Sequence, residues 1–262
     1  MKKFLTLGLM CIGAFSMTSC LGTGSNETSG TTAGVVEYHS KVGKNVVYIN
    51  DFEFFYVPKV ATDVSIQDGD CCMLGYQLNY DAPENTDAYQ KGYYTAQAIS
   101  YVKMNTYETI PSLTDTTKLL PAESAISNLD NTAPNERWGL IRNKLFINTY
   151  HKDVLTNMKA DFDLSFDSNA EPVEVMGKRV YNLYLRMVVT DEGESPMQSV
   201  VNVNTFKLRH FMEQMTYREK SADKDEVCFR INYIKDLEKE TLKPTWTFTE
   251  PYIYKIPKED KM

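Results

Sequence analysis

Histidine is scarce in this sequence, and the usual motifs of catalytic and metal sites are missing. Among 262 residues there are three histidines, and no two lie three or four positions apart, the spacing that places two imidazoles on one helix face. They are His39, His151 and His210. His151 and Asp153 could face the same way in a strand, although a surface turn explains them equally well. The chain also lacks GxSxG and phosphate-binding glycine-rich motifs. We therefore predict no catalytic residues, no metal and no cofactor.

Cysteine is too sparse for a disulfide framework. The chain has five, of which Cys11 lies in an N-terminal apolar segment and Cys20 follows that segment. A bridge from Cys228 to Cys71 or Cys72 stays open, whereas a bond between the two adjacent cysteines would be strained in a strand. Buried, unpaired thiols are the favoured state for these three residues.

The N-terminal apolar run is too short to span a membrane. It covers residues 4–15, whereas a helix needs about 20 residues to cross the hydrocarbon core. Two lysines precede it and the small residues 16–19 follow it, which is the layout of a secretory signal peptide over residues 1–19. Residues 17–19 resemble those before the lipid-modified cysteine of bacterial lipoproteins, so we expect cleavage before Cys20 and acylation there. An ordinary signal peptide cut elsewhere is the alternative.

Positive charge is in deficit. The chain has 28 Lys and Arg against 35 Asp and Glu, and loss of Lys2 and Lys3 with the signal peptide leaves a net charge of about −9. Affinity for nucleic acid comes largely from basic side chains that neutralise phosphates. Nucleic acid is therefore not an expected partner.

What the sequence contains in quantity is the two-residue alternation of β-strands. The segment before it, residues 20–34, is rich in Gly, Ser and Thr and predicts a flexible tether. Residues 35–110 then show about five short apolar and aromatic runs, with turns at residues 50–51 and 68–70 and a bulge at Gly75. Short strands with many small residues are typical of a small OB-like barrel.

The second half predicts a separate β domain. Residues 111–134 are polar and punctuated by proline, so we interpret them as a linker with at most a short helix near residues 122–129. Residues 135–257 contain several cleanly alternating runs separated by turns, which favours a β-sandwich.

One segment of this half has helical periodicity. Its apolar residues fall at i, i+3, i+4 and i+7, and they are Leu208, Phe211, Met212 and Met215. We expect a helix over residues 205–218 with Asn204 or Thr205 as N-cap, covering a sheet edge or barrel end. The predicted fold class is mainly β: a small OB-like barrel followed by a β-sandwich domain with one short covering helix.

Tyrosine is abundant, with seventeen in the chain. Tyrosines can stack on sugars or lie at protein interfaces while the hydroxyl stays hydrated. Four in the barrel half form a candidate binding face: Tyr76, Tyr80, Tyr93 and Tyr101. Since tyrosine is enriched in strands generally, packing within the barrel is the favoured interpretation.

The order of these features also indicates a family. The chain resembles the NigD-like lipoproteins in the order of its parts: a cysteine after a signal peptide, a tether, a barrel-like half and a sandwich-like half. The sandwich-like half contains the segments KLFINTY and RVYNLYLRMVVTDEG. The resemblance implies an OB-like domain followed by a β-sandwich, and it supplies no catalytic residues. In the bacteria that carry this family, acidic residues directly after the cysteine mark surface export. Here residues 21–25 precede the first acid, Glu27, so an outer-membrane lipoprotein facing the periplasm is expected.

Three functions remain open. The preferred one is a lipid-anchored envelope protein with a non-enzymatic binding or accessory role, attached through lipid on Cys20 and contacting a protein or glycan partner. The first alternative is a structural pilus-type anchor or subunit that works by strand donation, with residues 245–248 and 252–256 as the strand that exchanges. The second is a hydrolase with an unrecognised pair of carboxylates in a deep pocket.

Overall fold

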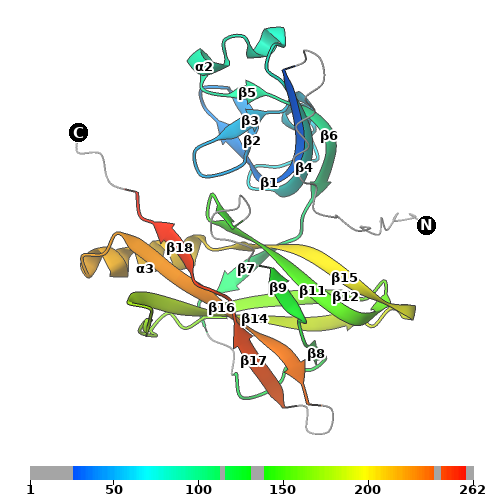
Figure 1. Cartoon of the computed structure of the whole chain (residues 1–262), viewed down its shortest axis with the longest axis vertical. Coiled ribbons are helices and arrows are strands. Elements are labelled where there is room, and N and C mark those ends of the chain that lie inside the picture. Colours follow the sequence, from blue (N-terminus) through cyan, green and yellow to red (C-terminus); the bar gives the residue numbers. More distant parts are fainter. Residues whose placement is uncertain (1–25, 113–115, 131–138, 239–242, 258–262) are drawn as a thin grey trace.

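The computed structural model describes residues 26–112, 116–130, 139–238 and 243–257, which form two β units (Figure 1). The expected signal peptide and Cys20 lie outside the described residues. The larger unit carries one long helix and the smaller unit only short ones. The predicted mainly-β fold with two units and one covering helix is confirmed. Within the described ranges, no helix combines the length and the apolar character needed to span a membrane.

The N-terminal unit is a curled sheet of six strands in the order β5-β3-β2-β1-β4-β6. Alternate side chains of β4 point into its core because successive strand residues face opposite ways. The register between β4 and β6 shifts at Gly75 and Tyr76, which confirms the predicted bulge. The elements are β1 (Glu27–His39), β2 (Lys44–Tyr48), β3 (Phe54–Tyr56), α1 (Pro58–Thr62), β4 (Cys71–Asn79), η1 (Pro83–Asn85), α2 (Ala88–Lys91), β5 (Tyr94–Thr95) and β6 (Gln97–Lys103).

Strand β1 corrects the predicted tether. Residues 27–34 were expected to be flexible, but they form the first part of β1 and pair with β4 from Glu27 opposite Asn79 onward. Backbone pairing needs no large side chain, so a Gly- and Thr-rich segment can form a strand when a partner lies beside it. A Cβ at Gly34 would lie 2.4 Å from Val47 Cγ1, so this close approach requires glycine.

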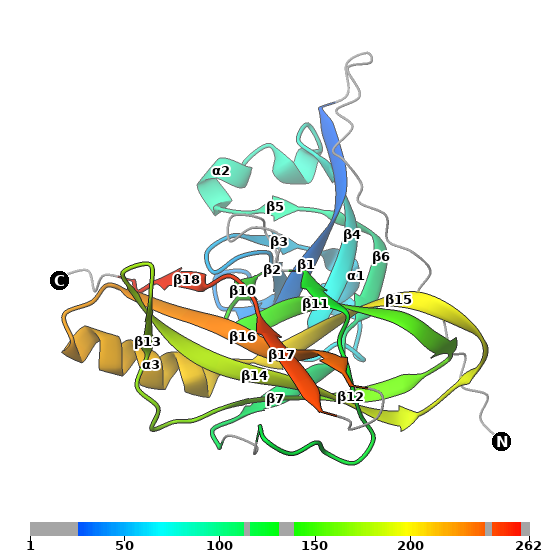
Figure 2. The same cartoon turned by 60° about the horizontal axis from the view of Figure 1, so that its bottom comes forward.

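The second unit is a larger curled sheet. Its main path runs β10-β11-β15-β7-β12-β14-β16-β17, with β9 on β11, β8 and β13 on β14, and β18 on β16. Because β7 pairs with both β15 and β12, the two expected sandwich layers are parts of one sheet (Figure 2). The elements are β7 (Thr106–Ile110), β8 (Glu123–Ser124), β9 (Asn128–Asp130), β10 (Leu140–Ile141), β11 (Lys144–Thr156), β12 (Lys159–Phe166), β13 (Val173–Val175), β14 (Lys178–Asp191), β15 (Glu194–Lys207), α3 (Arg209–Ser221), β16 (Glu226–Leu237), β17 (Pro244–Phe248) and β18 (Tyr252–Lys255).

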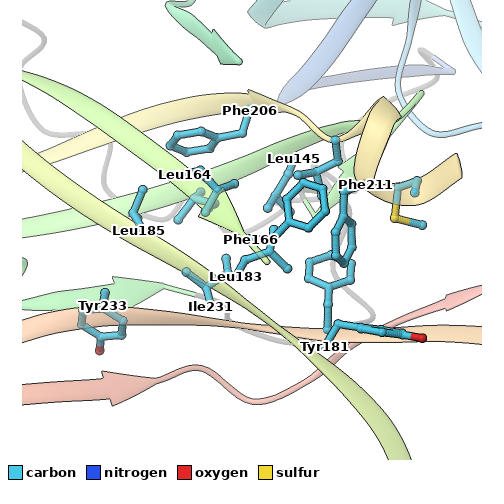
Figure 3. Close-up of a cluster of buried hydrophobic side chains, with 14 of the residues drawn as sticks. Leu145, Leu164, Phe166, Tyr181, Leu183, Leu185, Phe206, Phe211, Ile231 and Tyr233 are labelled. Atoms are coloured by element: carbon cyan, nitrogen blue, oxygen red, sulfur yellow. The ribbon is translucent and has the colours of Figure 1, made fainter. Parts of the chain in front are cut away.

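Helix α3 covers part of the second unit's core. Its buried residues Phe211, Met212 and Met215 meet side chains from β11, β12, β14, β15 and β16 (Figure 3). The predicted apolar stripe is therefore confirmed, but the helix begins at Arg209 because β15 continues through Lys207. The expected caps are wrong: Leu208 is the N-cap, without a side-chain hydrogen bond.

The predicted boundary between the units also needs correction. Strand β7 lies inside the expected first domain, residues 35–110, yet it belongs to the second sheet. Within the expected linker, residues 111–134, strands β8 and β9 replace the short helix and pair with β14 and β11. These strands were not predicted because their local sequence is polar. They form by pairing with strands that are distant in sequence.

The two units pack through a shared apolar cluster. Side chains of β1, β2 and β4 meet Ile141 and Phe146 of the second unit there, and all are buried. Arg142 reinforces the contact, since its Nε donates to Glu37 Oε2 at 2.9 Å and its guanidinium lies 4.6 Å from the centre of the Tyr48 ring. The backbone N–H of Arg142 also donates to Asp51 Oδ1 at 2.7 Å.

Candidate functional site

The four tyrosines of the candidate binding face do not share one exposed surface. Tyr76 is buried in the core of the N-terminal unit, and Tyr80 and Tyr101 pack partly buried against the same core. Tyr93 lies elsewhere, stacked on Phe54 with ring centres 5.5 Å apart. Tyr93 lies between α2 and β5, outside the strands that carry Tyr76 and Tyr101, so nearness in sequence did not place these rings together. Packing within the N-terminal unit, which was the favoured interpretation, therefore applies to Tyr76, Tyr80 and Tyr101.

The histidines are separate from one another. His39 lies 4.4 Å from the ring centre of Phe54, and His210 is exposed on α3. His151 is buried, its Nε2 lies 2.9 Å from Thr149 Oγ1, and burial lowers its pKa to about 4. In the part of the chain that the structure describes, no three His, Cys, Asp or Glu side chains gather as a metal site would require.

The three described cysteines are free and buried. No bridge joins Cys228 to Cys71 or Cys72, which resolves the pairing that the sequence left open. Burial raises the pKa of Cys72 to about 12 and that of Cys228 to about 11. A thiol reacts as its thiolate, so these side chains behave as small apolar groups near neutral pH.

The buried carboxylates of the second unit form ion pairs and hydrogen bonds with neighbouring side chains. Arg186 and Glu123 form an ion pair with side chains 1% and 0% exposed, and Arg186 Nε donates to Glu123 Oε1 at 2.5 Å. Glu219 accepts hydrogen bonds from Tyr181 Oη at 2.5 Å and from Arg179 Nε at 3.1 Å. Burial, followed by this bond to Glu219, raises the pKa of Tyr181 to about 12. These carboxylates hold strands and helix together and are closed to a ligand.

A polar pocket in the N-terminal unit is the candidate functional site. It has a volume of about 130 Å³ and lies at the end of β1, β4 and β6, beside η1. Six of its lining side chains are amides or carboxylates: Glu27, Gln77, Asn79, Glu84, Asn85 and Gln97. Among the described residues, no lysine, arginine or aromatic side chain lines it. We call it the amide pocket.

Strand pairing brings the amide pocket together. Glu27 of β1 pairs with Asn79 of β4, and Gln77 of β4 pairs with Gln97 of β6. Directly paired residues project from the same face of a sheet, so the four side chains gather there. Glu27 Oε1 accepts from Asn79 Nδ2 at 2.8 Å, and Oε2 accepts from Gln77 Nε2 at 3.2 Å.

Asn85 fixes the wall of the pocket. It is 4% exposed, and its Nδ2 donates to the carbonyl oxygens of Asn79 and Thr95 at 2.8 and 3.0 Å. The N–H of Thr95 donates back to Asn85 Oδ1 at 2.8 Å. Three hydrogen bonds from one buried side chain thus hold η1, β4 and β5 in place and give the pocket a fixed shape.

Chemically, the amide pocket can accept hydrogen bonds from a small polar ligand. The side chains of Glu84 and Gln97 make no hydrogen bond or ion pair within the described residues, so both are open to a ligand. Sequence reasoning missed this site because Glu27 was assigned to the tether and the amides carry no motif. The only local signal is the group of amide residues near the end of β4 and the start of β6, namely Gln77, Asn79 and Gln97.

Comparison with known proteins agrees with this architecture. Residues 24–102 match the family model described as "Lipoprotein OB domain". An uncharacterised protein from Parabacteroides merdae has 23% sequence identity and a TM-score of 0.75, with 87% of this chain and 100% of that chain covered. A protein from Bacteroides fragilis described as a "Putative lipoprotein" has 12% identity and a TM-score of 0.55, with 87% and 100% covered. No curated protein matches the chain.

A NigD-like immunity protein from Bacteroides caccae is also similar, with 13% identity over 83% of this chain and 91% of that chain. Its TM-score of 0.48 is too low to support an argument. The solved structures show the fold, whereas the family match identifies the first unit. The expected resemblance to lipoproteins is therefore confirmed, and the matched residues 24–102 include every residue of the amide pocket.

Proposed function

We propose that this chain is a lipid-anchored envelope protein with a non-enzymatic binding role, attached through acyl chains on Cys20. The observation that carries the proposal is the agreement between two independent signals. The family match begins at residue 24, four positions after the cysteine that ends the lipoprotein-type signal. A lipid anchor of two or more acyl chains gives stable attachment without a membrane-spanning helix.

Mass spectrometry of the mature protein tests the anchor. We expect a chain that begins at Cys20 and carries a diacylglycerol and an N-linked acyl group. Cys20→Ser should leave the signal peptide uncleaved and remove both lipids. A mature N-terminus at another residue without acyl chains contradicts the anchor.

We place the protein in the outer membrane, facing the periplasm. Support comes from residues 21–25, which contain no acid. Protease added to intact cells should leave the protein whole, and should cleave it after the outer membrane is permeabilised. Cleavage on intact cells would instead place it on the surface.

A binding role is favoured over catalysis. Burial raises the pKa values of the described thiols, and the buried carboxylates of the second unit are held by Arg186, Arg179 and Tyr181. Activity screens with glycosides and peptides should give no turnover above background. Turnover at enzyme-like rates would overturn this part of the proposal.

Strand donation is the second candidate, favoured by the C-terminal end of the described chain. Strand β18 has four residues and pairs with one end of β16, while β17 pairs with the other end. So short a strand can exchange at the cost of few hydrogen bonds. A peptide of residues 250–262 should bind a variant that ends at residue 249 under this hypothesis, and should not bind the intact chain.

A further inference from the structure

We propose that the amide pocket binds an amino sugar, a ring that carries hydroxyls and one ammonium group. The inference rests on the proposed binding role and assigns it to one place and one ligand class. It is drawn from the hydrogen-bonding groups, charge and size of the pocket.

The first argument is the balance of donors and acceptors. The amide nitrogens of Gln77, Asn79 and Asn85 already donate to Glu27 or to backbone carbonyls. The groups left open are the carboxylate of Glu84, the remaining lone pairs of Glu27 and the amide of Gln97, so acceptors outnumber the N–H donors of that single amide. A ligand that matches this lining must be rich in donors, as hydroxyl and ammonium groups are.

The second argument is charge. Two carboxylates line the pocket, and no basic side chain lines it. Lys91 reaches the carbonyl oxygen of Glu84 at 3.3 Å, but it is paired with Asp87 at 2.5 Å. A cationic ligand is therefore attracted, and an acidic sugar is repelled by both carboxylates.

The third argument is size and rigidity. A volume of about 130 Å³ lies well below the roughly 300 to 1,000 Å³ of pockets for drug-sized ligands, so the site suits a single ring. Asn85 holds the wall through three hydrogen bonds, and Glu27 is held across β1 and β4. A site already in its bound shape loses little entropy when the ligand enters.

A bare divalent cation fits less well. Calcium takes six to eight oxygen ligands, often with carboxylates in bidentate contact. Both oxygens of Glu27 already accept amide hydrogens, and those amides turn their nitrogen atoms toward this carboxylate. The geometry is that of a hydrogen-bonding site.

The test is a ligand-observed NMR titration of the full mature protein, purified in detergent, with glucosamine, glucose and glucuronate. We expect glucosamine to bind about fivefold more tightly than glucose, because one added ion pair at a solvent-accessible site is worth up to about that factor. Glucuronate should show no binding, and 0.5 M NaCl should weaken the glucosamine signal.

Two variants and a matched control locate the site. Glu84→Gln should weaken glucosamine binding about fivefold without affecting the fold, because the exposed Glu84 side chain makes no hydrogen bond or ion pair within the described residues. Glu27→Gln should act in the same direction while its amide oxygen still accepts from Asn79. Glu192→Gln, which removes the same charge at an exposed turn of the second unit, should leave binding unchanged.

Three outcomes overturn the inference: no binding of glucosamine, equal affinity for glucuronate, or calcium that displaces glucosamine from the wild-type protein. Mass spectrometry of the same preparation separates this failure from that of the proposed function. An acylated Cys20 together with an empty pocket rejects the amino-sugar site alone. A chain without lipid rejects the anchor, whatever the pocket binds.

Discussion

The two units place their carboxylates in opposite ways. In the second unit the Glu123 and Glu219 side chains are 0% and 2% exposed, and basic side chains and a tyrosine hold both of them. In the N-terminal unit Glu27 and Glu84 are exposed, and the Glu27 carboxylate accepts hydrogen bonds from the amides of Gln77 and Asn79. A buried charge must be paired, whereas an exposed one stays available to a ligand. These two carboxylates of the second unit therefore stabilise the fold, whereas Glu27 and Glu84 of the first unit are accessible to the proposed ligand.

The largest effect should come from the buried ion pair of the second unit. Glu123→Gln leaves the Arg186 guanidinium buried without a counter-charge, and we expect a loss of about 3 kcal/mol or more in the free energy of unfolding. Urea unfolding followed by circular dichroism measures it. A loss below about 0.5 kcal/mol would show that water reaches Arg186, and the contrast between the units would then fail.

Acid should weaken the second unit through His151. Its pKa is lowered to about 4 in the folded chain, against about 6.5 when unfolded, so the unfolded state binds more protons between these values. Stability due to this residue is complete above about pH 6.5 and is lost as the pH falls through about 4, by about 3 kcal/mol in all.

Urea unfolding at several pH values checks the His151 prediction, with His151→Gln as the control that cannot titrate. The variant should lose stability less steeply between pH 6.5 and 4. Identical slopes for the two proteins would assign the acid sensitivity to other groups.

A smaller effect is expected at the second buried carboxylate. Tyr181→Phe removes the hydrogen bond from Tyr181 Oη to Glu219, while Arg179 still contacts this carboxylate. A hydrogen bond to a charged group contributes about 1.5 kcal/mol, so the free energy of unfolding should fall by about that amount. An unchanged urea midpoint would mean that Arg179 alone satisfies Glu219.

The smallest effect should come from the amide pocket. Glu84→Gln should change the free energy of unfolding by less than about 0.5 kcal/mol, because exposed substitutions away from packed features rarely do more. The same urea experiment measures it, with Glu123→Gln as the contrast. Strong destabilisation would make Glu84 a structural residue and remove the distinction between the units.

Features set by neighbouring residues could be predicted from the sequence. The apolar stripe that includes Phe211, Met212 and Met215 predicted α3, and Gly75 predicted the bulge. Both features depend on residues within a few positions of one another. Strand β1 and the amide pocket could not be predicted. Both depend on pairing across about fifty residues, as between Glu27 and Asn79, and polar strand residues have no hydrophobic pattern that reveals it.

The early start of β1 sets how far the protein can stand from the bilayer. Strand β1 begins at Glu27, seven residues beyond Cys20, and a fully extended segment of that length would reach only about 25 Å. Since Glu27 itself lines the pocket, an acylated protein would hold its candidate binding site within a few headgroup diameters of the lipid. Molecules captured there would be those that diffuse close to the membrane surface.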